Sequence, residues 1–407
     1  MHMKFAINTL LLLTLLGSSV ARAQSPMREQ ALRKAAINAG VKPLSEIYIE
    51  PNSAMADIGA KLFESKLLSF NGEMSCQTCH LDAFSSADGL PNAIGTGGFG
   101  EGRERQNSKG DIVPRNTLPL WGRGTKGFDT FFWGGKVSKT TEGIESQFGA
   151  SLPSNDPLVV AVHLPFVEIR EMVVRDDRIK KKYEKENFNS AEEIFAILVE
   201  RVKNDPVLGT ELGQAANIKI GNLKFANVAE AIAEFIREKF KIKTTQFNEF
   251  VFNGGTLTKE QLRGGLIFYG KGQCSICHSG ALMSDLKFYV MPFEQVGFGK
   301  NGFGVDYGRF NATRNPDDIY KFRTPPLVNV AKTGPYSHSG AYHNLNDIIL
   351  AHVDPLANYN GKERTPTQRR EDLSRIANWS KMMSLPEPLS VEEIELIIEF
   401  LNTTTTE

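Results

Sequence analysis

Apolar residues recur at helical spacing in several segments of this 407-residue chain. In residues 54–70, the side chains of Ile58, Leu62 and Leu67 fall near one face of a helix, and Gly72 follows. This pattern predicts an amphipathic helix that ends in a glycine-containing loop.

A second segment has the same organisation. Thr258 and Gln261 have the spacing of a capping box, which predicts that a helix opens there and continues over Leu262–Tyr269 before Gly270 and Gly272. The two segments form a weak internal repeat, which indicates two structural units that each contain a few helices.

Two further segments show helical periodicity. One predicts a packed helix early in the second unit, with core positions Val228, Ile232, Phe235, Ile236 and Phe240. The other has a capping box at Ser390 and Glu393, and its apolar positions are Ile394, Ile397, Ile398 and Leu401. Strand signals are few and short, and the glycine-rich stretches 95–110 and 297–308 predict long surface loops. The fold class is therefore mainly α.

Each helix of the internal repeat leads into the same short motif, and the two motifs use all four cysteines of the chain. They are Cys76-Gln-Thr-Cys79-His80 and Cys274-Ser-Ile-Cys277-His278. In Cys-x-x-Cys-His the two thiols form thioethers to haem, and the histidine becomes the proximal iron ligand. Zinc sites or disulfides would need this spacing to arise twice by coincidence. The sequence predicts two c-type haems in two cytochrome c-like haem domains with long loops.

The amino terminus has the features of a secretory signal peptide over residues 1–23. A basic start precedes the apolar run Leu10–Leu16, and Ala21-Arg22-Ala23 is a small-x-small cleavage site. The run is shorter than the ~20 residues that span a bilayer, which argues against a membrane anchor, and no later segment is apolar enough to span. Because bacteria attach haem c outside the cytoplasm, we expect the protein in the periplasm.

The charges exclude some partners and leave the haem chemistry open. With 47 basic and 47 acidic residues the net charge is zero, so nothing indicates nucleic acid or an anionic membrane as partner.

A haem with two strong protein ligands carries electrons, whereas a haem with an open position can bind peroxide. The histidines that remain as second ligands are His163, His338, His343 and His352, and methionine is the other common ligand. An isolated histidine is more often a surface or hydrogen-bonded residue.

From about Ile58 to Leu401 the chain resembles the bacterial di-haem cytochrome c peroxidase and MauG family. Besides the two haem motifs, the matching strings are Ala87-Asp88-Gly89, Pro114-Arg115-Asn116-Thr117, Phe132-Trp133-Gly134-Gly135, Glu171-Met172, Phe322-Arg323-Thr324-Pro325-Pro326-Leu327 and Pro335-Tyr336-Ser337-His338-Ser339-Gly340. The resemblance implies an N-terminal extension over 24–53, a first, peroxidatic domain over 54–185 and a second, electron-relay domain over 186–407, whose C-terminal tail packs on the first domain.

The resemblance also implies roles for individual residues. Glu171 would lie on the distal side of the first haem and move a proton between the oxygens of hydroperoxide. Trp133 would lie between the haems as an electron relay. Asn116, through its side chain, and Thr333 and Pro335, through backbone oxygens, match the family's calcium site, and oxygen ligands suit that cation. The implied electron donor is a small periplasmic cytochrome c or cupredoxin, and a homodimer is compatible with the family.

Three departures from the family pattern affect the chemistry. The loop that supplies a distal histidine in typical peroxidases carries Thr96 here, so we expect the first haem to be open when fully oxidised, with His163 as a rival distal ligand. Where the family has methionine or tyrosine as second ligand of the relay haem, this chain has His352 on the predicted helix Leu345–Val353. Imidazole in place of thioether favours the ferric state. Gly134 and Lys136 replace an aspartate and an arginine of the family motif. The exchange removes a carboxylate and replaces a planar guanidinium by an ammonium group, so bidentate hydrogen bonds near Trp133 are lost.

These features leave three functions to compare. The first is a peroxidase that reduces hydrogen peroxide to water, a cytochrome-c peroxidase-type oxidoreductase. The second is a MauG-like oxidase that uses peroxide to modify tryptophan or tyrosine of a partner protein, and Thr96 and His352 favour it. The third is an electron-transfer cytochrome without enzyme activity, against which Glu171 and the missing distal ligand argue.

Overall fold

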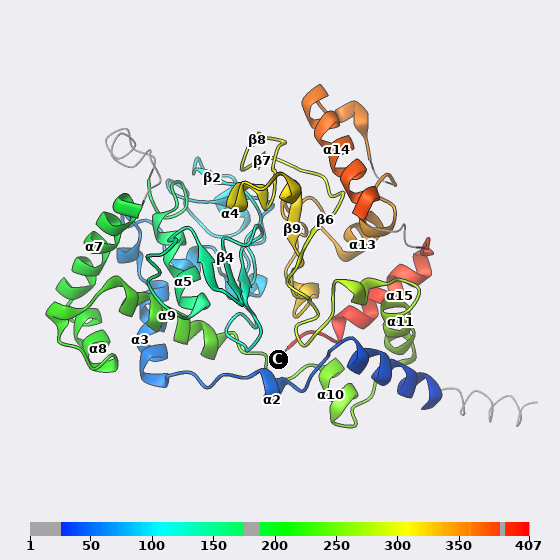
Figure 1. Ribbon diagram of the computed structural model, residues 1–407, viewed down its shortest axis with the longest axis horizontal. Helices are drawn as coiled ribbons and strands as arrows, with labels where there is room; N and C mark the ends of the chain where they lie inside the picture. The colour runs from blue at the N-terminus through cyan, green and yellow to red at the C-terminus, as the bar shows by residue number, and fades with distance from the viewer. Residues whose placement is uncertain (1–25, 175–187, 358, 383–386, 407) are drawn as a thin grey trace, which may run out of the picture.

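The computed structural model describes residues 26–174, 188–357, 359–382 and 387–406, so the predicted signal peptide lies outside the described residues. The described chain is mainly helical, as predicted (Figure 1). Residues 26–38 form its first helix. The following α-helices are α2 (Leu44–Ile47), α3 (Ser53–Glu64), α4 (Arg103–Gln106), α5 (Pro157–His163), α7 (Phe188–Asn204), α8 (Leu208–Ala215), α9 (Phe225–Lys239), α10 (Gln246–Phe252), α11 (Lys259–Tyr269), α12 (Phe310–Thr313), α13 (Leu345–Val353), α14 (Pro366–Met382) and α15 (Val391–Asn402).

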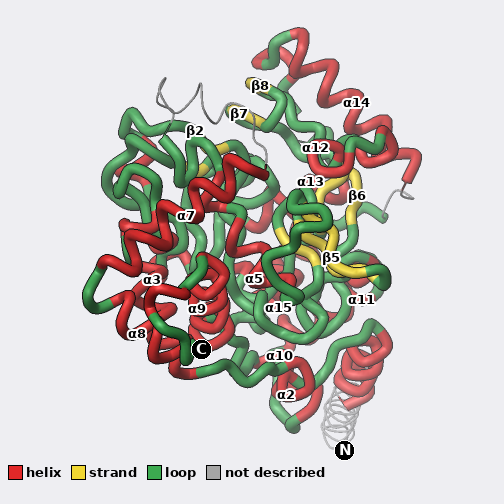
Figure 2. The backbone as a smooth tube through the Cα atoms, turned by 60° about the vertical axis from the view of Figure 1, so that its left-hand side comes forward, coloured by secondary structure: helices red, strands yellow, loops and turns green. Residues whose placement is uncertain are grey.

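The strands are short and pair only with near neighbours, except β6 and β9. They are β1 (Ala93–Ile94), β2 (Ile112–Val113), β3 (Thr130–Phe131), β4 (Val137–Thr140), β5 (Gly143–Ser146), β6 (Phe288–Val290), β7 (Phe298–Gly299), β8 (Gly302–Phe303) and β9 (Lys321–Arg323). The antiparallel sheets are β1-β2, β3-β4-β5, β6-β9 and β7-β8. Figure 2 shows that loops make up most of the chain between these elements. The glycine-rich stretches are mostly loop, as predicted, with only short elements inside them.

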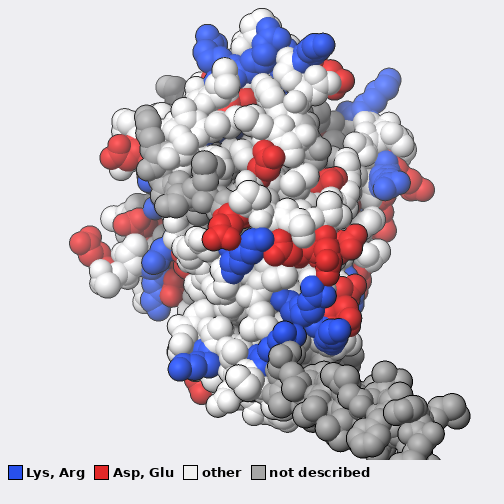
Figure 3. All heavy atoms as spheres, turned by 90° about the vertical axis from the view of Figure 1, so that its right-hand side faces the viewer, with Lys and Arg blue, Asp and Glu red and all other residues white. Residues whose placement is uncertain are grey.

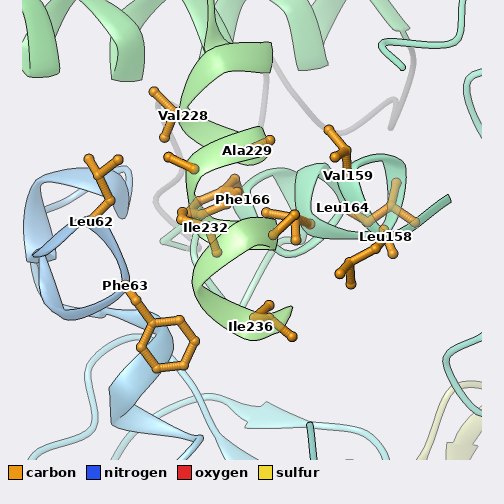
Figure 4. Close-up of a cluster of buried hydrophobic side chains, with 14 of the residues drawn as sticks. Leu62, Phe63, Leu158, Val159, Leu164, Phe166, Val228, Ala229, Ile232 and Ile236 are labelled. Carbon is orange, nitrogen blue, oxygen red and sulfur yellow. The ribbon is translucent and has the colours of Figure 1, made fainter. Parts of the chain in front are cut away.

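The first hydrophobic core forms where α9 lies between α3 and α5 (Figure 4). Asn52 caps α3 by accepting a hydrogen bond from the Met55 backbone N–H at 3.2 Å. The α3 and α9 backbones are in direct contact, because a Cβ added to Gly59 would lie 2.0 Å from the Ala231 carbonyl oxygen. Only glycine permits this approach, so the residue fixes where the two helices cross.

The second core forms around α11 and α15, and it repeats this crossing. A Cβ added to Gly264 of α11 would lie 1.8 Å from the carbonyl oxygen of Leu396 in α15. Both capping boxes predicted from the sequence are present, Thr258 with Gln261 and Ser390 with Glu393. In each unit, the helix before the haem motif therefore packs through a glycine on a later helix, which gives the weak internal repeat a structural basis.

Two expectations about domain organisation differ from the packing. Helices α7 to α9 pack in the first core, although the family resemblance assigns residues 186–407 to the second domain. The reason is that the apolar face of α9, including Val228 and Ile232, covers α3 and α5. The C-terminal tail packs on the second unit rather than the first: Thr406 N–H donates to Asn329 at 2.8 Å, and Thr245 pairs with Thr406.

The helix predicted for residues 54–70 ends earlier, at Glu64. Ser65 is extended and accepts a hydrogen bond from the Leu67 N–H, which starts a 3-10 turn, Lys66–Leu68. Leu67, expected on the apolar face, is consequently exposed. By contrast, α13 has the predicted bounds Leu345–Val353. Among the residues that the structure describes, no helix is long and apolar enough to cross a membrane.

The surface carries charges of both signs. On the face with α11 and α15, acidic and basic side chains occur side by side (Figure 3). Arg263 of α11 pairs with Glu392 of α15, and Lys271, just after α11, pairs with Glu393 of α15, both at 2.8 Å. No single sign dominates there, in agreement with the zero net charge of the whole chain.

Candidate functional site: two haem cavities

The first haem motif lies at the wall of a cavity of about 190 Å³. Cys76 begins a 3-10 turn, Cys76–Thr78, so that Cys76, Cys79 and His80 all line this cavity. The His80 Nδ1 atom lies 2.7 Å from the Ser86 carbonyl oxygen. When Nδ1–H donates to this carbonyl, Nε2 is left as the free lone pair, the usual arrangement for a metal-binding histidine.

Burial keeps the His80 imidazole neutral, because it lowers the pKa of this histidine to about 4. Burial also raises the pKa of the Cys76 thiol to about 12. None of the four cysteines forms a disulfide. The motif therefore presents two uncharged thiols and one neutral imidazole to the cavity, the donor set that covalent haem attachment uses.

Glu171 lines the same cavity as His80. Burial raises the pKa of the Glu171 carboxyl, and the charges of Lys136 and Lys300 partly oppose this shift. Both lysines also pair with Glu168, Lys136 directly and Lys300 at 3.4 Å. The cavity thus contains, in Glu171, a carboxyl group that keeps its proton to higher pH than an ordinary glutamate, beside the ion-paired carboxylate of Glu168.

The rival distal ligand His163 does not line the first cavity, and neither does Thr96; His80 is the one histidine among the described lining residues. Thr96 is buried elsewhere, and its N–H donates to the Arg170 carbonyl at 2.9 Å. His163 is buried among aromatic rings, with its ring centre 5.3 Å from that of Phe195 and 5.4 Å from that of Phe225. The geometry gives His163 no part in this cavity.

The second haem motif lines a separate cavity of about 240 Å³, together with His352 from α13. The ring centres of His278 and His352 are 6.4 Å apart. The Nδ1 atoms of both lie near backbone carbonyls, at 3.1 Å from Met283 O for His278 and 2.6 Å from Ile348 O for His352. Metal–nitrogen bonds of about 2 Å place two imidazoles on opposite sides of one ion with centres about 6 Å apart, so the pair fits a haem iron.

The other two candidate histidines are placed differently. His338 lines the second cavity but stacks on Phe322, with ring centres 3.7 Å apart, and its Nε2 lies 2.9 Å from the Gln295 side-chain oxygen. His343 is exposed and lines neither cavity. Among the described histidines, only His352 therefore faces His278 with a ring nitrogen left for a metal.

Trp133 lines both cavities, together with Asn116 and Leu118. Its indole N–H donates to the Asn116 carbonyl at 2.9 Å, and its own carbonyl accepts from the Arg323 N–H at 2.8 Å. These bonds fix the indole in the wall that the cavities share. The position is compatible with the relay role implied by the resemblance.

Two arginines that the sequence did not single out lie at the same wall. Arg123 lines the first cavity and Arg323 the second. Their guanidinium groups donate to backbone carbonyls, and within the described residues neither has a carboxylate partner. Burial lowers the pKa of Arg123 to about 10 and that of Arg323 to about 9. Two buried cations without carboxylate partners fit the propionate groups of bound haem. Arg323 belongs to the family-like segment Phe322–Leu327, but the sequence does not show that its side chain is buried.

The residues expected to bind calcium come together at the second cavity, where Asn116, Thr333 and Pro335 all lie in the lining. The Asn116 side-chain amide donates to the Pro335 carbonyl at 2.8 Å. In the described parts of the chain, no group of three or more histidine, cysteine or acidic residues is arranged to hold a metal ion. A cation here would have to use neutral oxygen atoms.

The chain is similar to known proteins of one family. A family model described as di-haem cytochrome c peroxidase matches residues 53–255. The cytochrome-c peroxidase IdrP1 of Pseudomonas sp. (strain SCT) is 26% identical over 316 residues, covering 72% of this chain and 70% of the relative. The methylamine utilization protein MauG of Methylorubrum extorquens is 23% identical over 340 residues, covering 82% and 78%.

A solved structure shares the fold. The diheme peroxidase BthA of Burkholderia thailandensis has a TM-score of 0.62 at 18% identity, covering 90% of this chain and 89% of that chain. The comparisons confirm the family indicated by the sequence motifs, and its enzyme class, a cytochrome-c peroxidase-type oxidoreductase. The chain belongs to the di-haem cytochrome c peroxidase family.

Proposed function

We propose that the protein is a periplasmic di-haem c peroxidase that reduces hydrogen peroxide to water, with electrons passing from the second haem to the first. One observation carries the proposal: the two cavities differ in their ligands. The first pairs His80 with the acid-base group Glu171, whereas the second opposes His278 to His352. One cavity is suited to substrate and the other to electron storage.

The haem-binding residues follow from the lining of each cavity. Cys76, Cys79 and His80 would hold the first haem, and Cys274, Cys277, His278 and His352 the second. When bound, haem supplies iron that exchanges electrons and, at an open position, takes up peroxide. Arg123 and Arg323 would neutralise the propionates at the wall between the cavities.

Glu171 performs the acid-base step. Its carboxylate accepts a proton from one oxygen of hydrogen peroxide and delivers it to the other, which leaves as water. The overall reaction uses one hydrogen peroxide, two electrons and two protons and gives two water molecules. Burial supports the role, because the raised pKa of Glu171 brings its proton affinity closer to that of the reacting oxygens.

Trp133 relays the electrons, since it is in van der Waals reach of both cavities as part of their common lining. His352 sets the direction of transfer. A haem held by His278 and His352 would have a lower reduction potential than one held by a histidine and a methionine, so it would give up electrons readily. The donor that refills it is a small periplasmic cytochrome c or cupredoxin.

A MauG-like oxidase is the second candidate, and the ligand pair His278 and His352 favours it. A relay haem that loses electrons readily can share oxidising equivalents with the first haem and oxidise tryptophan or tyrosine of a partner protein. The similarity to MauG supports this candidate as well. A purely electron-transferring cytochrome is less well supported, because the first cavity offers Glu171 and no second histidine among its described lining.

We also propose that calcium occupies the point where Asn116, Thr333 and Pro335 meet, bound by the Asn116 amide oxygen and the two backbone oxygens. Oxygen-only ligation suits calcium, and the site would tie the loop that carries Asn116 in the first unit to residues 333–335 in the second.

The experiment that tests the function is the stoichiometry of turnover. The di-haem protein is mixed with a limiting amount of hydrogen peroxide and excess reduced small cytochrome c. A peroxidase oxidises two donor molecules for each peroxide consumed. If peroxide is consumed while the donor stays reduced, the peroxidase assignment is wrong and the oxidase remains.

A further inference from the structure

A larger cavity, of about 590 Å³, lies directly beside the Glu171 cavity. Its walls come from the segment around Glu168, from α7 and from α12 of the second unit. The two cavities share four charged residues, Arg115, Lys136, Glu168 and Lys300. We call the larger one the outer cavity. A molecule bound in it would lie next to the peroxide site, separated from it by charged side chains.

Among the described residues that line the outer cavity, basic side chains outnumber acidic ones. Glu168 is its one acidic lining residue among those described, and it is shared by the two lysines. The other two cations of the lining are Arg115 and Arg314. Arg115 is neutralised by Asp306, to which it donates two hydrogen bonds at 2.9 and 2.8 Å. Arg314 is exposed at the end of α12, and no carboxylate of the described residues pairs with it.

Part of the lining of the outer cavity is apolar. It consists of Phe148, Leu164, Val167, Ile169, Ala191 and Ile194. An apolar wall facing a few charged groups is the usual composition of a site for a small organic molecule, and the volume falls within the roughly 300–1,000 Å³ of such sites. An inorganic anion would make no contact with the apolar residues, whereas an organic anion would contact them and also balance the excess positive charge of the described lining.

We propose that the outer cavity binds a small aromatic carboxylate. Its carboxylate group contacts Lys136, Lys300 and Arg314, and its ring packs on the apolar wall around Phe148. Gly134 contributes to the space for the ligand, because a Cβ at this position would lie 3.2 Å from the Arg115 Nη1 atom. The site is distinct from the peroxide site and does not depend on the proposed peroxidase activity.

The test is equilibrium binding of 4-hydroxybenzoate to the purified di-haem protein by titration calorimetry at low ionic strength, without peroxide or electron donor. The neutral analogue 4-hydroxybenzyl alcohol is titrated in parallel. We expect the acid to bind about tenfold more tightly than the alcohol, the scale of one charge-assisted interaction. Raising the salt concentration should weaken binding of the acid only.

Variants locate the site. Arg314→Gln and Lys300→Gln should each weaken 4-hydroxybenzoate binding, by about threefold for the exposed Arg314. The matched control is Lys139→Gln on β4, an exposed lysine outside the lining, which should leave binding unchanged. Equal affinity for acid and alcohol, no measurable binding of the acid, or unchanged affinity in both lining variants would overturn the proposal. Because no turnover occurs in this experiment, these outcomes leave the peroxidase assignment unaffected.

Discussion

The imidazole rings of His278 and His352 face one another across the second cavity with their centres 6.4 Å apart. This spacing is that of two ligands on opposite sides of one metal ion. The first cavity offers no such pair, because His80 is its one histidine among the described lining residues. The contrast between the cavities is the structural basis for assigning peroxide to the first haem and electron storage to the second.

Replacing His352 by methionine should raise the reduction potential of the second haem. A thioether stabilises the ferrous state relative to imidazole, and axial ligands move haem potentials over a range of about 0.8 V, so we expect a rise of at least about 0.1 V. Spectroelectrochemical titration of both haems measures it. The control is His343→Ala, an exposed histidine outside both cavities, which should change neither haem. If His352→Met left the low-spin haem spectrum and potential as they are, His352 would not be the ligand.

Glu171→Gln should leave both haem spectra intact and slow the reaction with peroxide by about 10²-fold or more, the scale of a lost acid-base group. The wild-type rate should fall as the pH drops through the pKa of Glu171, since only the carboxylate accepts the peroxide proton. Burial raises this pKa, so the fall should begin above the ordinary glutamate range. The variant should lack this pH-dependent limb.

Two controls separate the role of Glu171 from general effects. Glu142→Gln changes an exposed carboxylate in the turn between β4 and β5 and should retain the wild-type rate and pH profile. Lys300→Gln should move the acid limb to higher pH, because the Lys300 charge lowers the pKa of Glu171. An acid limb that persists in Glu171→Gln would assign the titration to another group.

Arg323→Gln should lower the potential of the second haem. The buried guanidinium stabilises the reduced haem, which carries one positive charge less, and a unit charge about 10 Å away at an effective dielectric constant of about 20 corresponds to on the order of 50–100 mV. Arg123→Gln should act mainly on the first haem, whose cavity it lines. Potentiometric titration of the two variants checks the assignment, and equal shifts of both haems in both variants would argue against it.

Gly59→Ala should destabilise the first unit, because the added Cβ would lie 2.0 Å from the Ala231 carbonyl oxygen and would force α3 away from α9. We expect a loss of about 3 kcal/mol in the free energy of unfolding, at the upper end for overpacked contacts. Urea unfolding followed by circular dichroism measures it. Gly221→Ala is the matched control, because a Cβ there meets no atom within 4 Å. A similar unfolding midpoint for both variants would show that the helix crossing can relax.

Features encoded over short distances in the sequence were predictable. The capping boxes at Thr258 and Ser390 and the helix that carries His352 depend on neighbouring residues only, and the structure has them as predicted. The haem motifs are likewise local. The structure places Glu171 and His80 in the lining of one cavity, although they lie 91 positions apart in the chain.

Features that depend on distant contacts were not predictable. The apolar face of α9 predicts that this helix is packed, but its sequence does not say against which unit, and in the structure it packs in the first core. Leu67 fits the helical period, yet Ser65 ends the helix before it. The burial of Arg123 and Arg323 without carboxylates, and the outer cavity beside Glu171, arise only when the two units come together.

The central claim is that the first haem has an open position in the fully oxidised protein. Stopped-flow absorption of the di-ferric protein mixed with stoichiometric hydrogen peroxide, with no reductant present, tests it most directly. We expect a rapid spectral change at the first haem, since none of the described residues lining its cavity supplies a second histidine. If no reaction occurs until one haem has been reduced, a distal ligand is present in the oxidised state and the claim is wrong.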